Sequence, residues 1–398
     1  MFLDVIRRRN PTLIEQTIAL HQSGRLPANA YIVDLDAVES NARHIFGIAT
    51  KLGLKTYAMT KQIGRNRSFC EAVARGGIKK AVAVDMECAR AVNRAGLALG
   101  HIGHLVQIPR FEADAAASFN PDYWTVLDFQ KAIEAGAAAK KHGRTQPLLA
   151  RIFAEGDKFY RGHEGGFAAS DILSVANALD DVPGARFSGI TTFPSQLFDQ
   201  TSGKVIATPN LATLRHAAEA LAKAGRTDIE LNAPGTTSSE SLPMLAEAGA
   251  TQIEPGHGLT GTTPLHALED LPEIPAIVYL SEVSHRHGGE AFCFGGGFYV
   301  DPVFPDYTVR AVVSREPTVS AAAIAPVDIP SPASIDYYGM IQETGAVKPS
   351  IGDSVVFGFR PQAFVTRAFV VGIVGLSTNK PVVEPIYDSF GRLTHWPL

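Results

Sequence analysis

The sequence predicts an α/β fold followed by a β-rich second domain, and three observations support this. From residue 30 to about residue 265, short apolar runs of strand character alternate with longer segments of helical periodicity. Past Pro264 the apolar runs continue, but Gly, Pro and Asp turns separate them and no long helical pattern is found. The length of 398 residues exceeds that of a typical single core, so two domains are expected.

The α/β region opens with a predicted strand at Ile32–Leu35. Further strands are predicted near residues 56–60, 80–84, 102–107, 123–127, 147–153, 186–193, 228–232 and 251–254. Ala-rich helical stretches lie between most of them, such as Asp128–Lys141, Ala168–Leu179 and Leu211–Ala224. Eight strands with intervening helices favour a (β/α)8 barrel, although this spacing alone also permits an open sheet.

The remaining parts of the chain complete the predicted organisation. In the β-rich domain, strands are expected at Ala276–Val283, Val309–Val313, Asp353–Phe359 and Ala363–Ile373. Near the N-terminus, Leu13–Gln22 has a helical pattern that ends at Gly24. We therefore expect a helical segment at 1–29, a barrel at 30–265 and a β-rich C-terminal domain at 266–398.

Composition narrows the classes of function. The formal net charge is −4 and no long basic run is present, which argues against nucleic acid and anionic membrane surfaces as partners. The three cysteines are widely spaced and form no CxxC pair, so a disulfide framework or a zinc site is not supported. With no signal-peptide pattern and no apolar stretch near the ~20 residues of a membrane helix, a cytoplasmic protein is expected.

Two basic residues stand where a barrel places its chemistry, at the carboxyl ends of strands. Lys61 directly follows the strand predicted at 56–60, and a lysine that is buried or flanked by cations suits a nucleophilic amine. A solvated loop lysine is the alternative. Arg151 falls within the strand predicted at 147–153, where a charge is costly unless it is paired. Its guanidinium fork suits a cofactor hydroxyl or a substrate carboxylate.

Two glycine-containing turns follow the last two predicted strands. The first contains Asn232, Gly235, Thr236, Thr237 and Ser238, and the second contains Glu254, Gly256, His257 and Gly258. A phosphate group needs closely approaching backbone N–H groups, hydroxyl donors and preferably a helix N-terminus. The late position in the barrel also matches the usual phosphate site of barrel enzymes. We therefore expect a phosphate here, with an ordinary Ser/Thr helix cap as the alternative.

The opening of the chain resembles the alanine-racemase-like, fold type III family of enzymes that depend on pyridoxal 5'-phosphate (PLP). The resemblance lies in the strand Tyr31–Val38, a helix with Asn41, and a second strand that ends at Lys61. Met59-Thr-Lys-Gln62, Gly103-His-Leu-Val-Gln-Ile-Pro109 and the stretch Glu254–Pro264 are similar to the YhfX-type branch. The resemblance covers residues 30 to 265 and extends more loosely to the end. It implies a barrel rather than an open sheet, with a β-rich C-terminal domain as in alanine racemase and ornithine decarboxylase.

The resemblance also implies roles for individual residues. Lys61 would carry PLP as a Schiff base. Glu254 resembles the glutamate of the decarboxylase branch that pairs with the pyridine nitrogen, where racemases have arginine. His257 stands where the decarboxylase motif has arginine, so that match is incomplete. Phe193 aligns with a histidine that stacks on the cofactor ring in racemases, and a core phenylalanine is the alternative.

A racemase needs a base on each face of the Cα carbanion. Lys61 can serve one face, and in the family a tyrosine of the β domain, usually from the partner subunit, serves the other. Tyr299 and Tyr338 are the candidates here, with His285 as a competitor. The region Gly358–Phe364 lacks the His–Cys zinc pair of some relatives, so no metal is expected. His101 and His104 flank a predicted strand and are interpreted as structural histidines.

Together these observations predict a PLP-dependent enzyme that acts at the Cα of an amino acid or related amine through a Schiff base on Lys61. An amino-acid racemase or epimerase is the first hypothesis. A decarboxylase or other carbon–carbon lyase is the second, supported by Glu254, and a PLP carrier or regulator without turnover is the third. The family resemblance implies a homodimer.

Overall fold

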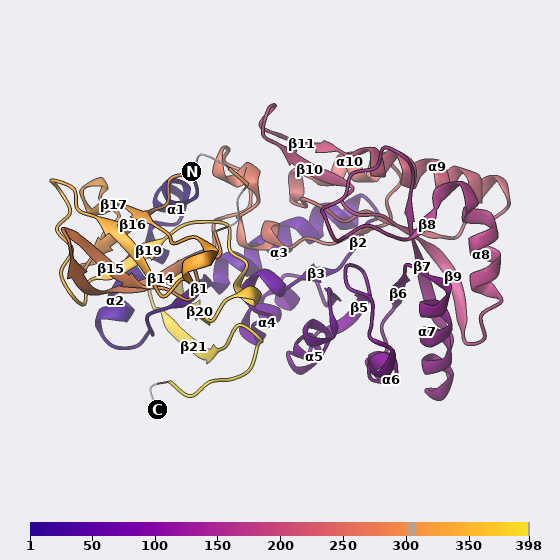
Figure 1. The fold of residues 1–398 in the computed structure, drawn as a ribbon, viewed down its shortest axis with the longest axis horizontal. Coiled ribbons are helices and arrows are strands. Elements are labelled where there is room, and N and C mark those ends of the chain that lie inside the picture. Colours follow the sequence, from indigo (N-terminus) through magenta and orange to yellow (C-terminus); the bar gives the residue numbers. More distant parts are fainter. Residues whose placement is uncertain (301–302, 305–306, 397–398) are drawn as a thin grey trace. The chain divides into compact units, whose positions relative to one another are not determined.

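The structure, a computed structural model, describes residues 1–300, 303–304 and 307–396 (Figure 1). Its contacts divide the chain into two compact units. The barrel unit comprises Arg43–Thr60 and Gly77–Gly256, and the β unit comprises Met1–Ala42, Lys61–Gly76 and His257–Leu398. Both units are thus assembled from separate stretches of chain, whereas the sequence analysis divided the chain into three contiguous ranges.

A closed parallel sheet forms the centre of the barrel unit. Its strands are β2 (Lys55–Thr56), β3 (Ala58–Met59), β4 (Lys80–Ala83), β5 (Ala98–Ile102), β6 (Tyr123–Val126), β7 (Gln146–Phe153), β9 (Ala185–Thr191), β12 (Glu230–Asn232) and β13 (Gln252–Ile253). They pair in the order β2-β13-β12-β9-β7-β6-β5-β4-β3. Because β2 and β3 belong to one stretch of chain, residues 55–59, the path starts and ends at the same place. The predicted (β/α)8 barrel is therefore confirmed, and the open sheet is excluded.

The predicted barrel strands agree with the observed ones to within two residues, with one exception. The strand predicted at 102–107 is wrong, because β5 is Ala98–Ile102 and the chain turns immediately afterwards. Gly103 adopts a left-handed φ of +74°. The Gln107 side chain donates to the carbonyl oxygens of Gly103 at 2.8 Å and Thr125 at 3.0 Å. The apolar residues between them resemble a strand in sequence but lie in this turn.

Helices alternate with strands along the chain from residue 35 to residue 247. They are α3 (Leu35–Lys51), α4 (Arg67–Arg75), α5 (Met86–Arg94), α6 (Ala113–Ser118), α7 (Phe129–Lys141), α8 (Ile172–Asp180), α9 (Pro209–Lys223) and α10 (Leu242–Glu247). The helix at 35–51 lies partly in the β unit, the helix at 67–75 lies wholly in it, and the others belong to the barrel unit. Asp85 and Asp128 cap α5 and α7, since their carboxylates accept from the backbone N–H groups of Cys88 and Gln130. The short elements of this unit are η2 (Arg110–Glu112), β8 (Phe167–Ala168), η3 (Ala169–Asp171), β10 (Gln196–Asp199), β11 (Lys204–Ala207) and η4 (Ser239–Ser241).

The β unit is built on a second sheet, in the order β15-β18-β17-β16-β19-β14-β1-β20-β21. Its strands are β1 (Ala30–Asp34), β14 (Ile277–His287), β15 (Glu290–Phe294), β16 (Arg310–Ser314), β17 (Ile324–Asp328), β18 (Tyr338–Gln342), β19 (Ser354–Phe357), β20 (Phe369–Val374) and β21 (Val382–Tyr387). The predicted β-rich C-terminal domain is therefore confirmed. The β1 strand is antiparallel to β14 and parallel to β20. The strand expected at Ile32–Leu35 therefore belongs to this sheet.

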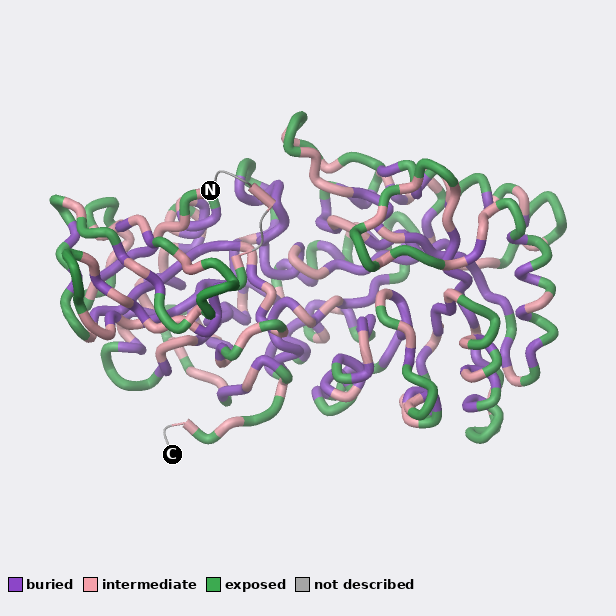
Figure 2. The backbone as a smooth tube through the Cα atoms, in the orientation of Figure 1, coloured by how far each residue is buried: buried purple, intermediate pink, exposed green. Residues whose placement is uncertain are grey.

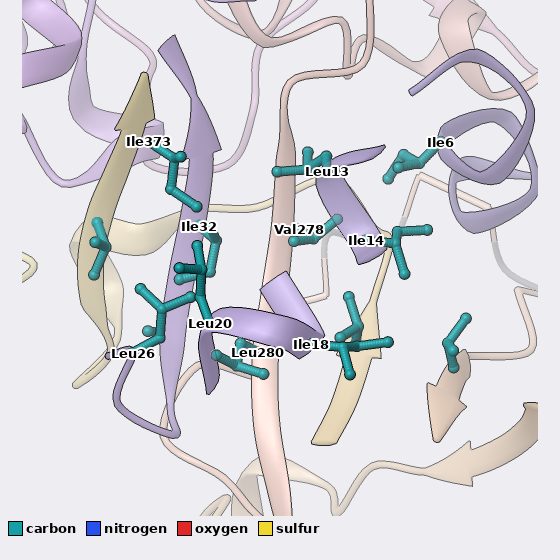
Figure 3. Close-up of a cluster of buried hydrophobic side chains, with 14 of the residues drawn as sticks. Ile6, Leu13, Ile14, Ile18, Leu20, Leu26, Ile32, Val278, Leu280 and Ile373 are labelled. Carbon is teal, nitrogen blue, oxygen red and sulfur yellow. The ribbon is translucent and has the colours of Figure 1, made fainter. Parts of the chain in front are cut away.

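Two N-terminal helices cover part of this sheet, α1 (Phe2–Arg9) and α2 (Pro11–Gln22). Figure 3 shows their apolar side chains beside β1, β14 and β20. Ile14 and Ile18 of α2 and Ile32 of β1 have no exposed surface. Burial of one such side chain stabilises a fold by about 1.5–3 kcal/mol, so the N-terminal segment is part of the core of the β unit. The 3-10 turns of the β unit are η1 (Lys61–Ile63), η5 (His257–Thr260), η6 (Pro264–Ala267), η7 (Ala321–Ala323), η8 (Pro332–Ser334), η9 (Ala363–Val365) and η10 (Leu376–Thr378).

Burial follows this architecture in both units. Figure 2 shows the strands largely as buried, while most connecting segments are intermediate or exposed. The segment 154–166, between β7 and β8, is one such connection and contains no buried residue. Among the helices in the described ranges, none is both long enough and apolar enough to cross a membrane.

Candidate functional site

Buried polar side chains gather around Glu254 at the carboxyl end of the barrel strands. Glu254 directly follows β13, and Asn232 is the last residue of β12. His101 lies in β5, and His104 lies two residues beyond it. All four residues are buried. Because a parallel barrel brings the ends of its strands to one face, residues far apart in the sequence meet here.

One carboxylate oxygen of Glu254 is fully engaged. His101 Nδ1 lies 2.6 Å from Oε1, and Asn232 Nδ2 donates to the same oxygen at 3.0 Å. Both donors are themselves oriented, because His101 Nε2 lies 2.5 Å from Thr125 Oγ1 and Asn232 Oδ1 accepts from Thr191 Oγ1 at 2.7 Å. From the residues that the structure describes, no hydrogen bond reaches Oε2, which lies 3.5 Å from His104 Nε2.

The surroundings of Glu254 favour its ionised form. Burial alone would raise the pKa of this carboxyl group. The charges of His104 and His101, with the hydrogen bonds from His101 and Asn232, outweigh burial and bring the pKa below its ordinary value. Glu254 is therefore a carboxylate at neutral pH, with one buried oxygen that can still accept a hydrogen bond.

Arg151, in β7, is a second buried charge. Its guanidinium donates to the carbonyl oxygens of His163 at 3.0 Å and Phe193 at 3.2 Å, and more weakly to that of His104 at 3.5 Å. Burial lowers the pKa of Arg151 to about 10, so it remains a cation at neutral pH. Within the described ranges, no carboxylate lies at ion-pair distance from it and its Nε has no hydrogen-bond partner. A buried cation without an anion is expensive, so the site is suited to an anionic ligand.

Aromatic rings lie beside these charges. The Phe193 ring meets the His104 ring edge-on, with centroids 5.7 Å apart. Tyr160 and His163, from the exposed segment after β7, lie 5.8 Å and 6.0 Å from the same ring. Phe193 is only half-buried, so it is not an ordinary core phenylalanine. Stacking of Phe193 on a cofactor ring stays a prediction.

The turn at residues 235–238 packs against Gln196. The Thr236 N–H donates to the Gln196 carbonyl oxygen at 3.1 Å, and Gln196 Nε2 donates to Thr237 Oγ1 at 3.1 Å. A Cβ atom at Gly235 would lie 2.5 Å from that carbonyl oxygen, so glycine is required by this close approach. The Ser238 N–H donates to Ser241 Oγ at 3.2 Å. The expected helix after the turn is the short η4 followed by α10, and the phosphate site stays a prediction.

Lys61 belongs to the β unit, where it begins η1, and only Thr60 separates it from β3 in the chain. Its ammonium group lies 4.9 Å from the centre of the Phe364 ring, and the Arg65 guanidinium lies 5.3 Å from the same ring. An aromatic face attracts such cations through its quadrupole. Lys61 is thus held by an aromatic ring in a cationic neighbourhood.

His257 begins η5 in the same unit, directly after Gly256 and before Gly258. Its Nδ1 lies 3.1 Å from Thr262 Oγ1, and its Nε2 lies 3.4 Å from Gln362 Nε2. Burial, together with the charges of Arg360, Lys61 and His266, holds the pKa of His257 well below its usual range. The histidine at this position is therefore neutral, unlike the arginine of the decarboxylase motif.

Comparison with known proteins defines the family. The family model described as "Alanine racemase, N-terminal domain" matches residues 33–264, and the model described as "YhfX-like, C-terminal domain" matches residues 278–383. The chain belongs to the alanine racemase-like family. Within it, the chain is 38% identical to the "Uncharacterized protein YhfX" of Escherichia coli strain K12 over 394 residues, which are 98% of this chain and 99% of that protein. The resemblance to the YhfX-type branch is thereby confirmed.

Solved structures share the fold of the family. D-threonine aldolase from Filomicrobium marinum superposes with a TM-score of 0.69 at 17% identity, covering 93% of this chain and 96% of that one. Alanine racemase from Clostridium difficile 630, in complex with cycloserine, superposes with a TM-score of 0.62 at 12% identity, covering 92% and 99%. A dehydratase and a decarboxylase also share this fold. Because the family supports several reactions, the fold does not fix which one occurs.

The second-base candidates lie in the β unit on exposed surface. Tyr299 is 47% exposed and lines an open groove of about 650 Å³ with Phe298, Ile335 and Arg367. Tyr338, in β18, is 37% exposed, and its ring packs edge-on against His285 with centroids 4.9 Å apart. Tyr338 therefore has a packing partner, whereas Tyr299 lies in the groove. Both remain predictions.

The sequence analysis missed the role of His101 and His104. Their spacing beside a strand was visible, but their contact with Glu254 joins residues 153 apart in the case of His101. The two histidines and Glu254 have ligand atoms within 4.8 Å of one another, which a metal ion could use. The 2.6 Å between His101 Nδ1 and Glu254 Oε1 is a hydrogen-bond distance, however. Two ligands at ~2.0–2.1 Å from a tetrahedral zinc ion are roughly 3.4 Å apart. The contact between His101 Nδ1 and Glu254 Oε1 is therefore too short for two atoms that bind one zinc ion.

Proposed function

We propose that this protein is a PLP-dependent enzyme that acts at the Cα of an amino acid or related amine, and that it is an amino-acid racemase or epimerase. The observation that supports dependence on PLP is Glu254, a buried carboxylate with one oxygen open to a donor. The protonated ring nitrogen of PLP is such a donor. Arg151, a buried cation without an anion among the described residues, suits the cofactor hydroxyl or a substrate carboxylate. These residues fit the cofactor.

Bound PLP supplies an electron sink that weakens the bonds at Cα of an attached amine. Lys61 Nζ would hold the cofactor and would accept or return the Cα proton on one face. Glu254 keeps the ring nitrogen protonated by accepting its hydrogen bond at Oε2. Phe193 would support the face of the ring, and the turns at 235–238 and 256–258 would hold the phosphate.

A second candidate is a decarboxylase or other carbon–carbon lyase, and Glu254 is the observation that favours it. A carboxylate beside the ring nitrogen strengthens the electron sink, which breaking a carbon–carbon bond requires. Both candidates begin by weakening a bond at Cα, so one experiment separates them. The PLP-loaded protein is incubated with a panel of amino acids in deuterium oxide and followed by proton NMR and chiral chromatography.

Loss of the Cα proton signal with inversion of configuration supports the racemase. Loss of the amino acid with appearance of an amine or aldehyde supports the lyase. No change with any amino acid would contradict both and favour a PLP carrier.

Lys61 can be tested without knowing the substrate. Reduction of the PLP-loaded protein with borohydride is expected to fix the cofactor on the peptide that contains Lys61, detected by mass spectrometry. Lys61→Ala should lose this adduct, while Lys51→Ala, which removes an exposed lysine, should retain it in full. An undiminished adduct in Lys61→Ala would remove this residue from the mechanism.

We also propose a homodimer in which a tyrosine of the partner subunit serves as the second base. The exposed side chains of Tyr299, Ile335 and Tyr337 in the β unit support this, because large apolar side chains at 47%, 51% and 61% exposure favour an interface. Light scattering measures the oligomeric state. Mixing Lys61→Ala with Tyr299→Phe, each unable to racemise alone, should restore racemisation, because one site of each mixed dimer is then intact. Tyr338→Phe is tested in the same way, and a lack of restoration with both would contradict a shared site.

A further inference from the structure

The two buried histidines beside Glu254 have no role in the proposed function as stated so far. His101 and His104 have no exposed side-chain surface beyond 1%, and their rings lie 5.2 Å apart. A buried ionisable side chain is retained where it forms specific interactions, because burial of a charge is otherwise costly. For these two histidines, the interactions include contacts with the carboxylate of Glu254.

The partners of His101 determine which ring nitrogen donates a hydrogen bond and which accepts one. A carboxylate can only accept, so the 2.6 Å contact with Glu254 Oε1 is a hydrogen bond donated by His101 Nδ1. In the neutral ring, Nε2 then accepts from the Thr125 hydroxyl at 2.5 Å. Both ring nitrogens of His101 thus have hydrogen-bond partners, which holds the ring in one orientation.

The same network orients the carboxylate of Glu254. Asn232 Nδ2 and His101 Nδ1 both donate to Oε1, and Thr191 fixes the Asn232 amide by donating to its oxygen. Because both donors bind Oε1, the second carboxylate oxygen, Oε2, is left to accept a hydrogen bond from a ligand. His104 Nε2, 3.5 Å from Oε2, adds a positive charge nearby when it is protonated.

We propose that His101 is a positioning residue that holds Glu254 ionised and directs Oε2 at the ring nitrogen of PLP, with His104 as its electrostatic support. This rests on the proposed function. It adds that the hydrogen-bonded chain of Thr125, His101 and Glu254 sets the protonation of the pyridine nitrogen of PLP. It excludes a metal ion bound by His101 and Glu254, whose contacting atoms share a proton.

The test compares PLP with its analogue in which C–H replaces the ring nitrogen. Both compounds carry the aldehyde and the phosphate, so they differ only in the atom that faces Glu254. Dissociation constants for the two are measured by titration of the cofactor-free protein. The wild-type protein should bind PLP at least ~10-fold more tightly, because the analogue leaves Oε2 buried without a donor. In His101→Gln this preference should fall ~10-fold, towards that of Glu254→Gln.

Two further variants and a metal analysis complete the test. His104→Gln should reduce the preference less than His101→Gln does, and it keeps the test decisive if His101→Gln does not fold. His21→Gln removes another buried histidine, which pairs with Glu282 at 3.1 Å in the β unit, and should leave the preference unchanged. Metal content of the wild-type protein is measured by mass spectrometry.

An unchanged preference in His101→Gln and His104→Gln, with both affinities lowered equally, would reduce these residues to a structural role and overturn the inference. A stoichiometric metal ion that is lost in His101→Gln would overturn it too. Failure of the wild-type protein to bind either compound would instead contradict the proposed function.

Discussion

The residues of the candidate site differ in what their surroundings do to their charge. Glu254 and Arg151 are buried as ions, whereas His257 is half-buried and neutral. Loss of solvation is the first cause of the lowered pKa of His257, and the positive charges around it lower the pKa further. The histidines around Glu254 act in the other sense, because they stabilise its carboxylate.

His257 leads to a prediction about pH. Its pKa is depressed in the folded state, so the unfolded chain binds more protons as the pH falls below the ordinary value of 6.5. The free energy of unfolding should therefore decrease as the pH falls from 6.5 towards the folded pKa, by at most about 1.4 kcal/mol per pH unit. Above 6.5 this contribution is constant.

Urea unfolding of the wild-type protein and His257→Gln between pH 5 and pH 8 measures this contribution. The difference in unfolding free energy between the two proteins should vary with pH only below about 6.5. A difference that is the same at every pH would show that His257 has an ordinary pKa.

At the level of elements, the strand–turn boundary after β5 places His104. The turn exists because Gly103 adopts a left-handed φ and packs closely against β6. An added Cβ would lie 2.6 Å from the Thr125 carbonyl oxygen. Gly103 thus combines a conformational and a steric requirement.

Gly103→Ala is expected to destabilise the protein by about 2–4 kcal/mol, the sum of a strained φ and displaced backbone. Gly96→Ala is the matched control, because Gly96 also has a left-handed φ of +83° but open space around it. Urea unfolding compares the two variants. Equal losses would mean that contact with Thr125 contributes nothing.

Periodicity was sufficient to predict most of the barrel. The apolar runs of the sequence lie at or next to most of the barrel strands, although β2, β3, β12 and β13 are only two or three residues long. The strand at 102–107 was misplaced because Leu105 and Val106 are apolar within a turn. The contact of His101 with Glu254 could not be predicted, since it forms only when β5 and β13 are placed in one closed sheet.

At the scale of the whole molecule, the N-terminal segment contributes to a sheet whose other strands come from the C-terminal part. No local pattern indicates this pairing, because β1 resembles any buried strand in composition. Its position between β14 and β20 makes β1 an interior strand of the sheet. A substitution that destabilises β1 should therefore also destabilise β14 and β20, which pair with it.

Ile32→Ala, in β1, is expected to reduce the free energy of unfolding by about 2–5 kcal/mol, since the side chain is fully buried. Ile133→Ala, the same change at a residue that is 49% exposed, should cost about 1 kcal/mol or less. Hydrogen exchange should show weakened protection in β14 and β20 of the first variant alone. Protection that remains at wild-type values there would contradict a central role for β1.

The position of β1 also has a consequence for synthesis on the ribosome. Residues 30–34 emerge early, but their partners in β14 and β20 are made only after Gly256, when all strands of the barrel already exist. The nascent chain must therefore keep apolar residues of α2 and β1 from aggregating while the barrel unit forms. Chaperone contact should be concentrated on this N-terminal segment until the last strands are translated.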